Sequence, residues 1–82
     1  MSINAVKKGM LARSKAGHDK GRVYVICEVD ETYVYLADGK IRTLSNLKKK
    51  KRKHVQVICD MQEMSGVDDV KIKRRLKLFD KE

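Results

Sequence analysis

The stretch from residue 10 to residue 29 constrains the fold more than any other part of this 82-residue chain. A mainly apolar run, Met10–Arg13, leads into a basic loop that contains two glycines, and the loop opens onto the valine-rich run Val23–Val29. Gly17 and Gly21 can adopt positive φ angles without a Cβ clash, so the chain can turn sharply there. The pattern predicts two β-strands joined by a glycine-hinged, positively charged loop.

Three further short runs predict additional strands. Tyr33–Ala37 is followed by Asp38 and Gly39, a pair that favours a type I′ hairpin with positive φ at both central residues. We therefore expect a fourth strand over Lys40–Leu44 and a fifth over Val55–Ile58. Short strands at intervals of about 8–12 residues are typical of small all-β folds, so the sequence predicts a mainly β barrel of about five short antiparallel strands.

Residues 61–82 form a tail after the barrel of residues 1–60, and the pattern of the tail favours a C-terminal α-helix. Asp68 is a suitable N-cap residue. A strand is the alternative, because side chains over residues 70–78 also alternate in part. The apolar residues of the tail recur at i, i+4 and i+7, on one helical face that would dock on the barrel: Ile72, Leu76 and Phe79.

Positive charge dominates the chain and is unevenly distributed. The formal net charge is +9, from 20 Lys and Arg against 11 Asp and Glu. Such an excess predicts a polyanionic partner, with nucleic acid ahead of an anionic membrane surface. Residues 48–53 are six consecutive cations. Because like charges repel, we expect this basic loop to be poorly ordered without a partner. It would either clamp phosphates or add only diffuse charge.

The residues around the glycine loop also resemble a known motif. The run Met10–Ser14, followed by Gly17–Arg22 and a valine-rich strand, is similar to the KOW motif of ribosomal proteins and transcription elongation factors. Gly21 stands where the motif has its most characteristic glycine. The likeness extends to KOW proteins that resemble the fourteenth large-subunit protein of archaeal and eukaryotic ribosomes, including small bacterial relatives. In these proteins Ala37–Arg42 and a lysine cluster ending at Lys53–His54 have counterparts.

The resemblance implies an SH3-like barrel, RNA binding without catalysis, and ribosomal RNA as the target. Ribosomal proteins are a further possible partner. A KOW module that binds other proteins of the transcription or translation machinery is one alternative, and a binder of double-stranded DNA is another. A basic membrane-surface helix in the tail is a third alternative, although its three apolar residues suffice only to dock on the barrel.

The candidate RNA-contacting residues carry a positive charge or an imidazole and fall into three segments. Gly17, Gly21 and Gly39 are expected to shape the loop and the hairpin. Tyr33 and Tyr35 share one face of a strand, where they either stack on bases or only favour the strand. The candidates are Arg13, Lys15, His18, Lys20 and Arg22 around the glycine loop, Lys40 and Arg42 in the hairpin, and Lys48, Lys49, Lys50, Lys51, Arg52, Lys53 and His54 in the cluster.

Several other classes of function lack support in the sequence. Asp19 reads as a local partner that tempers the charge of its loop, and we find neither a catalytic triad nor a phosphate-binding loop. Cys27 and Cys59 form no C-x-x-C pair, and strand parity predicts that both are buried. With His18 and His54 they match no zinc-finger spacing. We expect no cofactor, no metal and no disulfide. Without an apolar run of membrane-span length or a signal peptide, we expect a cytoplasmic protein.

Overall fold

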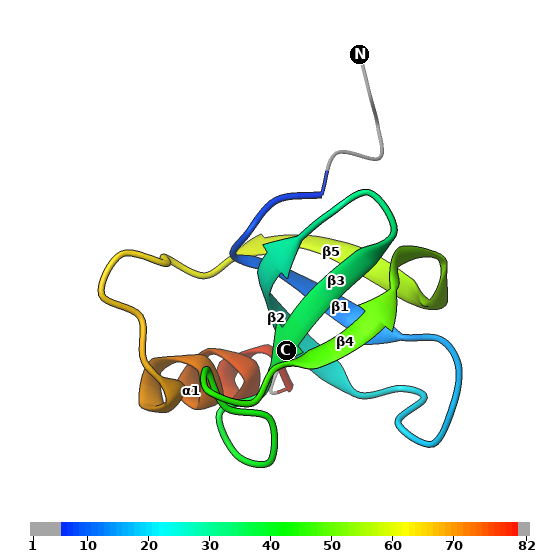
Figure 1. Ribbon diagram of the computed structural model, residues 1–82. Coiled ribbons are helices and arrows are strands. Elements are labelled where there is room, and N and C mark those ends of the chain that lie inside the picture. The colour runs from blue at the N-terminus through cyan, green and yellow to red at the C-terminus, as the bar shows by residue number, and fades with distance from the viewer. Residues whose placement is uncertain (1–5, 81–82) are drawn as a thin grey trace.

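Five antiparallel strands form a single curled sheet. The computed structural model describes residues 6–80, with the side chains of residues 59–61 left out of the description. The sheet order is β4-β3-β2-β1-β5, and the sheet bends into a half-barrel, followed by one helix (Figure 1). The predicted mainly β, barrel-like fold with a C-terminal helix is thus confirmed. The elements are β1 (Met10–Ser14), β2 (Val23–Val29), β3 (Tyr33–Ala37), β4 (Lys48–Lys51), β5 (Val55–Met61) and α1 (Asp69–Asp80).

The fourth strand is not where the sequence predicts it. Lys40–Leu44 belongs to an irregular loop, and the strand that pairs with β3 is the lysine run itself, Lys48–Lys51. No residue other than glycine has a positive φ in the described chain, so Asp38 and Gly39 do not form a type I′ turn. Instead, the Asp38 carboxylate accepts the backbone N–H groups of Lys40 (2.8 Å) and Arg42 (2.9 Å). This side-chain turn folds the loop back on itself and delays the strand.

The expectation that residues 48–53 are poorly ordered is also wrong. Four of the six cations pair with β3 as the strand β4, and the remaining two begin a short 3-10 turn, Arg52–His54. In a strand, consecutive side chains point to opposite faces. Alternation therefore separates neighbouring ammonium groups and relieves the repulsion that a compact loop would impose.

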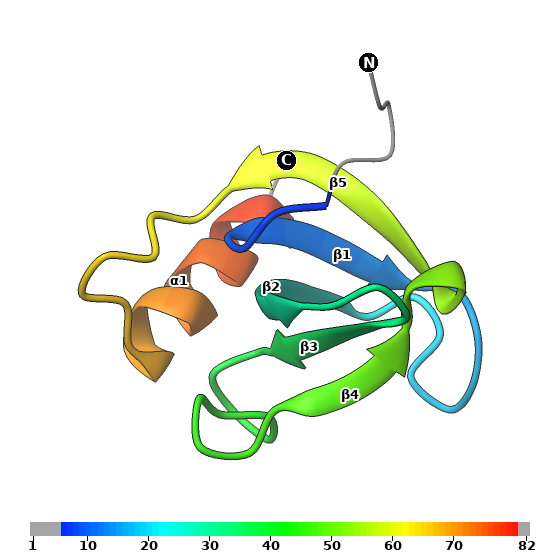
Figure 2. The ribbon, with the colours of Figure 1, turned by 45° about the horizontal axis from the view of Figure 1, so that its top comes forward.

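Both faces of β2 are buried, which divides the core into two clusters. Tyr24 and Ile26 pack inside the half-barrel, whereas Val25 packs on the outer face, which α1 covers (Figure 2). Tyr24 is therefore core and is not available to stack on bases. The register of β2 against β3 shifts between Ile26 and Glu28. Because of this bulge Val29 packs with the inner cluster, although simple alternation along the strand would put it on the same face as Val25.

The prediction that both cysteines are buried can be compared with the structure only for Cys27. Cys27 is half-buried against the cluster under α1. Burial raises the pKa of its thiol to about 11, so the thiol stays protonated at neutral pH. The side chain of Cys59 lies outside the described residues.

The tail is helical, as predicted, and the strand alternative is excluded. The Asp68 carboxylate caps α1 by accepting the Lys71 N–H at 2.8 Å. Ile72 is fully buried, and Leu76 and Phe79 pack around it against the sheet. In the part of the chain that the structure describes, no helix has the length and apolar character needed to cross a membrane.

The loop between β3 and β4 is fastened to the start of α1. The Leu44 N–H donates to the Asp69 carboxylate at 2.8 Å. Gly39 has φ +78°, and a Cβ at this position would overlap the backbone carbonyl of Asp69 and lie 2.9 Å from the Cβ of Lys73. Gly39 is thus required for close approach to the helix as well as for its backbone conformation.

Candidate nucleic-acid interface

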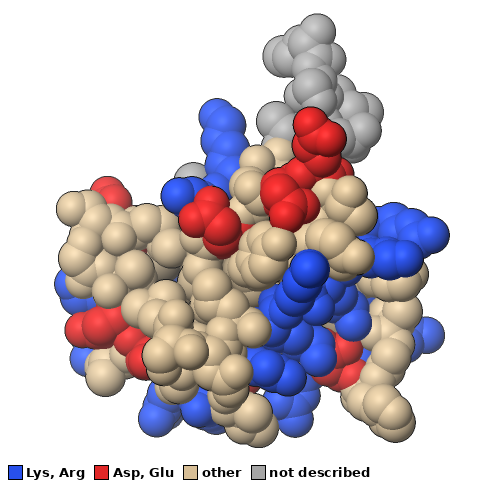
Figure 3. All heavy atoms as spheres, viewed as in Figure 1, with Lys and Arg blue, Asp and Glu red and all other residues tan. Residues whose placement is uncertain are grey.

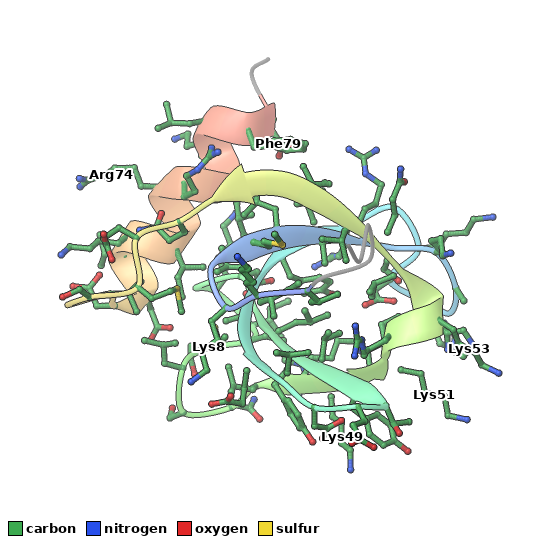
Figure 4. The ribbon with its side chains drawn as sticks, turned by 90° about the horizontal axis from the view of Figure 1, so that it is seen from above. Lys8, Lys49, Lys51, Lys53, Arg74 and Phe79 are labelled. Carbon is green, nitrogen blue, oxygen red and sulfur yellow. The ribbon has the colours of Figure 1, made fainter. Side chains whose placement is uncertain are left out.

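One face of β3 and β4 combines tyrosines with lysines. Lys49 lies opposite Tyr35 and Lys51 lies opposite Tyr33 in the ladder, so all four side chains share a face, which we call the β3–β4 face. Lys49 and Lys51 are exposed, and the two tyrosines are half-buried. Figure 3 shows cations gathered over β4, and Figure 4 shows Lys49 and Lys51 extending from this part of the molecule.

The two tyrosines already have polar partners. The Lys49 ammonium lies 4.2 Å from the centroid of the Tyr33 ring, within the range of a cation–π interaction. The Tyr35 hydroxyl donates to the Asp30 carboxylate at 2.7 Å. These contacts fix the rings on the surface and leave a mixed aromatic and basic patch.

The other two lysines of β4 point inward and are held by Asp19. Lys50 Nζ lies 3.0 Å from one oxygen of the Asp19 carboxylate, and Lys48 Nζ lies 3.7 Å from the other. Lys50 also donates to the carbonyl of Ala16 at 2.9 Å. These side chains are largely covered, with exposed fractions of 28% for Lys48, 12% for Lys50 and 11% for Asp19. Two cations of the run thus share one carboxylate within the molecule.

Asp19 is the centre of a polar network that also reaches β1 and β2. Its carboxylate accepts hydrogen bonds from the Ser14 and Tyr24 hydroxyls, each at 2.8 Å. Burial alone would raise the pKa of Asp19, but the hydrogen bonds, led by that of Ser14, outweigh burial and hold the pKa well below its usual range. Asp19 therefore tempers positive charge, but its cations come from β4 and not from its own loop, so the predicted local pairing is wrong.

The glycine loop, residues 15–22, lies beside β4. Gly17 and Gly21 have φ values of +87° and +93°, as predicted. A Cβ on Gly17 would lie 3.6 Å from Lys50 Nζ, whereas a Cβ on Gly21 would meet no atom within 4 Å. The Gly17 end of the loop thus faces β4, and the Gly21 end borders open space. The basic side chains of the loop are all exposed: Lys15, His18, Lys20 and Arg22.

The 3-10 turn after β4 contributes one exposed cation, Lys53. Arg52 is half-buried and donates from Nη1 to the carbonyl of Asp30 at 3.3 Å. His54 is half-buried, and its carbonyl accepts the Lys15 N–H at 2.8 Å. This backbone contact joins the glycine loop to the end of the lysine run, so two of the three predicted segments are adjacent.

The third predicted segment lies apart from that surface. Lys40 and Arg42 are on the loop that docks against α1. Arg13 also lies on the helix side, with its guanidinium 6.0 Å from the centroid of the Phe79 ring. The candidate residues therefore divide between the β4 side and the α1 side. Their separation depends on tertiary packing, which no local pattern in the sequence indicates.

The described side chains contain no group of three or more His, Cys, Asp or Glu residues that is arranged to hold a metal ion. Comparison of the sequence with protein-family models and with curated proteins found no match. The resemblance to KOW proteins accordingly rests on the motif residues alone.

Proposed function

We propose that this protein binds structured RNA through phosphate contacts. The observation that carries the proposal is the β3–β4 face, where two exposed lysines stand beside two surface tyrosines. The glycine loop, which contacts β4 at Lys50, adds further exposed cations. Cations of this kind position a phosphate backbone, and tyrosine rings offer surfaces on which bases stack. The resemblance to the KOW motif supports RNA as the polyanion.

Ribosomal RNA is the target that the resemblance favours. A curled sheet that carries exposed cations suits the shape and backbone of folded RNA better than a linear base sequence. The proposed setting is cytoplasmic and ribosome-associated, with ribosomal proteins as neighbours. No chemical step is assigned to the protein.

Lys48 and Lys50 both pair with Asp19, which lowers the number of cations available to RNA. The β4 side offers about five exposed cations (Lys15, Lys20, Lys49, Lys51 and Lys53). With about five phosphates neutralised, log K should fall with log[salt] with a slope of about −3.5 on single strands or about −4.5 on a duplex stem. All six cations of the run together with the loop would give a steeper slope.

Fluorescence anisotropy with a labelled stem–loop of large-subunit ribosomal RNA tests the proposal. The variant K49Q/K51Q should bind more weakly and flatten the salt slope by about 1.5. The matched control K71Q/R74Q removes the same charge from α1, where Arg74 points away from β4 (Figure 4). Equal losses of RNA affinity in the two variants would show that only net charge matters. The β3–β4 face would then not be the binding site.

Two other outcomes would replace RNA as the partner. Equal affinity for duplex DNA at the same salt concentration would favour a DNA-binding protein. Weak, salt-insensitive RNA binding beside tight binding to a protein would favour an interaction module.

A further inference from the structure

A cleft of about 530 Å³ lies between α1, the start of β2 and the loop that follows β3. Four cations line it: Arg22 from the end of the glycine loop, Lys40 from the docked loop, and Lys73 and Lys77 from adjacent turns of α1. Arg22 and Lys40 are candidates from two separate segments of the sequence, whereas neither helix lysine is a candidate there. The fold brings together cations that are more than 50 positions apart in the chain.

None of these four side chains is hydrogen-bonded or ion-paired within the part of the chain that the structure describes. All four are exposed. Two carboxylates also line the cleft, but that of Asp38 accepts the backbone N–H groups of its own loop. The remaining one, from Asp80, is at the end of α1. Cations therefore outnumber carboxylates two to one in the cleft, which favours an anionic ligand.

The walls of the cleft are not uniformly polar. Val23 and Leu76, both half-buried in the cluster under α1, form an apolar part of its lining. Gly21 adds a bare stretch of backbone with open space in front of it. The volume falls in the range of about 300–1,000 Å³ that is usual for small-molecule sites, so the cleft has room for more than a bare phosphate ion.

We propose that this cleft binds one nucleotide of the RNA. Its phosphate lies among the four cations, and its ribose or base lies against Val23 and Leu76. This inference rests on the proposed function, since the nucleotide belongs to a bound RNA. The glycine loop reaches β4 at Gly17, beside Lys50, and the cleft at Gly21, so an RNA strand that contacts the loop can continue into the cleft.

The test compares two double variants of α1 that remove equal charge. K73Q/K77Q empties the cleft of its helix lysines, whereas K71Q/R74Q leaves the cleft intact. We expect K73Q/K77Q to weaken binding of the labelled RNA stem–loop about tenfold relative to K71Q/R74Q, and to flatten the salt slope by about 1.5. Circular dichroism checks that both variants fold, since all four positions are exposed.

Amide chemical shifts locate the ligand independently of affinity. In the wild type, the RNA should shift the amides of Gly21, Val23 and Leu76, and K73Q/K77Q should abolish these shifts. If RNA binds but both variants lose equal affinity and these amides do not move, the cleft is overturned while the proposed function stands.

A second titration distinguishes the source of the nucleotide. If the wild type binds no RNA, the proposed function and the RNA nucleotide are both overturned. Shifts of the same amides with 5′-AMP alone, in a protein that does not bind RNA, would reassign the cleft to a free nucleotide. Weaker shifts with 5′-AMP than with RNA support the proposal.

Discussion

The β4 side and the α1 cleft use positive charge in opposite ways. The lysine run is the densest cluster in the sequence, yet Lys48 and Lys50 are held by Asp19 inside the molecule. The cleft draws its cations from three separate segments, and within the described residues none of them is neutralised by a carboxylate. Density along the chain therefore overstates the charge that β4 offers a ligand. In the α1 cleft, in contrast, the fold assembles a basic site that no local cluster in the sequence predicts.

The contrast between the β4 side and the α1 cleft depends most on Asp19, which holds two of the β4 lysines. Asp19→Asn should therefore have the largest effect on stability. We expect a loss of about 3 kcal/mol in the free energy of unfolding, because Lys48 and Lys50 would be left partly buried without a carboxylate. Urea denaturation followed by circular dichroism measures it. A loss below about 0.5 kcal/mol, typical of surface substitutions, would show that β4 does not depend on its internal carboxylate.

The stability difference between the wild type and Asp19→Asn should also depend on pH. The folded pKa of Asp19 is depressed, so its stabilising contribution is complete above the unfolded value of about 3.9 and is lost as the pH falls below it. The stability difference between the wild type and Asp19→Asn should therefore narrow below about pH 4. A difference that stays constant down to strongly acidic pH would contradict the assigned role.

The integrity of the cleft depends on Gly39, and Gly39→Ala should cost more stability than Gly21→Ala. Both glycines have positive φ, which costs a side chain about 1 kcal/mol. Only Gly39 also presses against the backbone of α1. We expect about 2 kcal/mol or more for Gly39→Ala in the same urea experiment. Equal losses would mean that the docked loop yields easily and that Lys40 is not fixed beside the helix.

The alternation of inward and outward lysines along β4 predicts the smallest stability difference. Lys50→Gln should lose about 1.5 kcal/mol through its bonds to Asp19 and Ala16. The matched change Lys51→Gln, on the exposed face, should stay within about 0.5 kcal/mol. Similar values for the two variants would blur the distinction between structural and available lysines in β4.

Most of the fold follows from local signals. The strands β2 and β3 match their predicted bounds because short valine- and tyrosine-rich runs are flanked by clear turn residues. The helix α1 was predictable because Asp68 supplies a cap and Ile72 begins an apolar face. The strand β4 was missed because Asp38–Gly39 is a strong hairpin signal. In the structure the Asp38 carboxylate instead accepts backbone N–H groups of its own loop.

The candidate site was less accessible to sequence reasoning. The residues of the glycine loop were identified from their composition, and both predicted φ angles are positive. The contact between Asp19 and Lys50 spans 31 positions, so only tertiary structure reveals it. The same holds for Lys73 and Lys77, which on the sequence belong only to an amphipathic helix.

The position of β4 in the sheet has a consequence for the behaviour of the protein in solution. β4 is the last strand on one side of the open half-barrel, and its outer backbone groups are a template on which another chain can add a strand. The exposed Lys49 and Lys51 raise the electrostatic cost of bringing a second copy to this edge. The lysine run thus protects the open sheet from self-association. Because this protection is electrostatic, we expect it to weaken at high ionic strength.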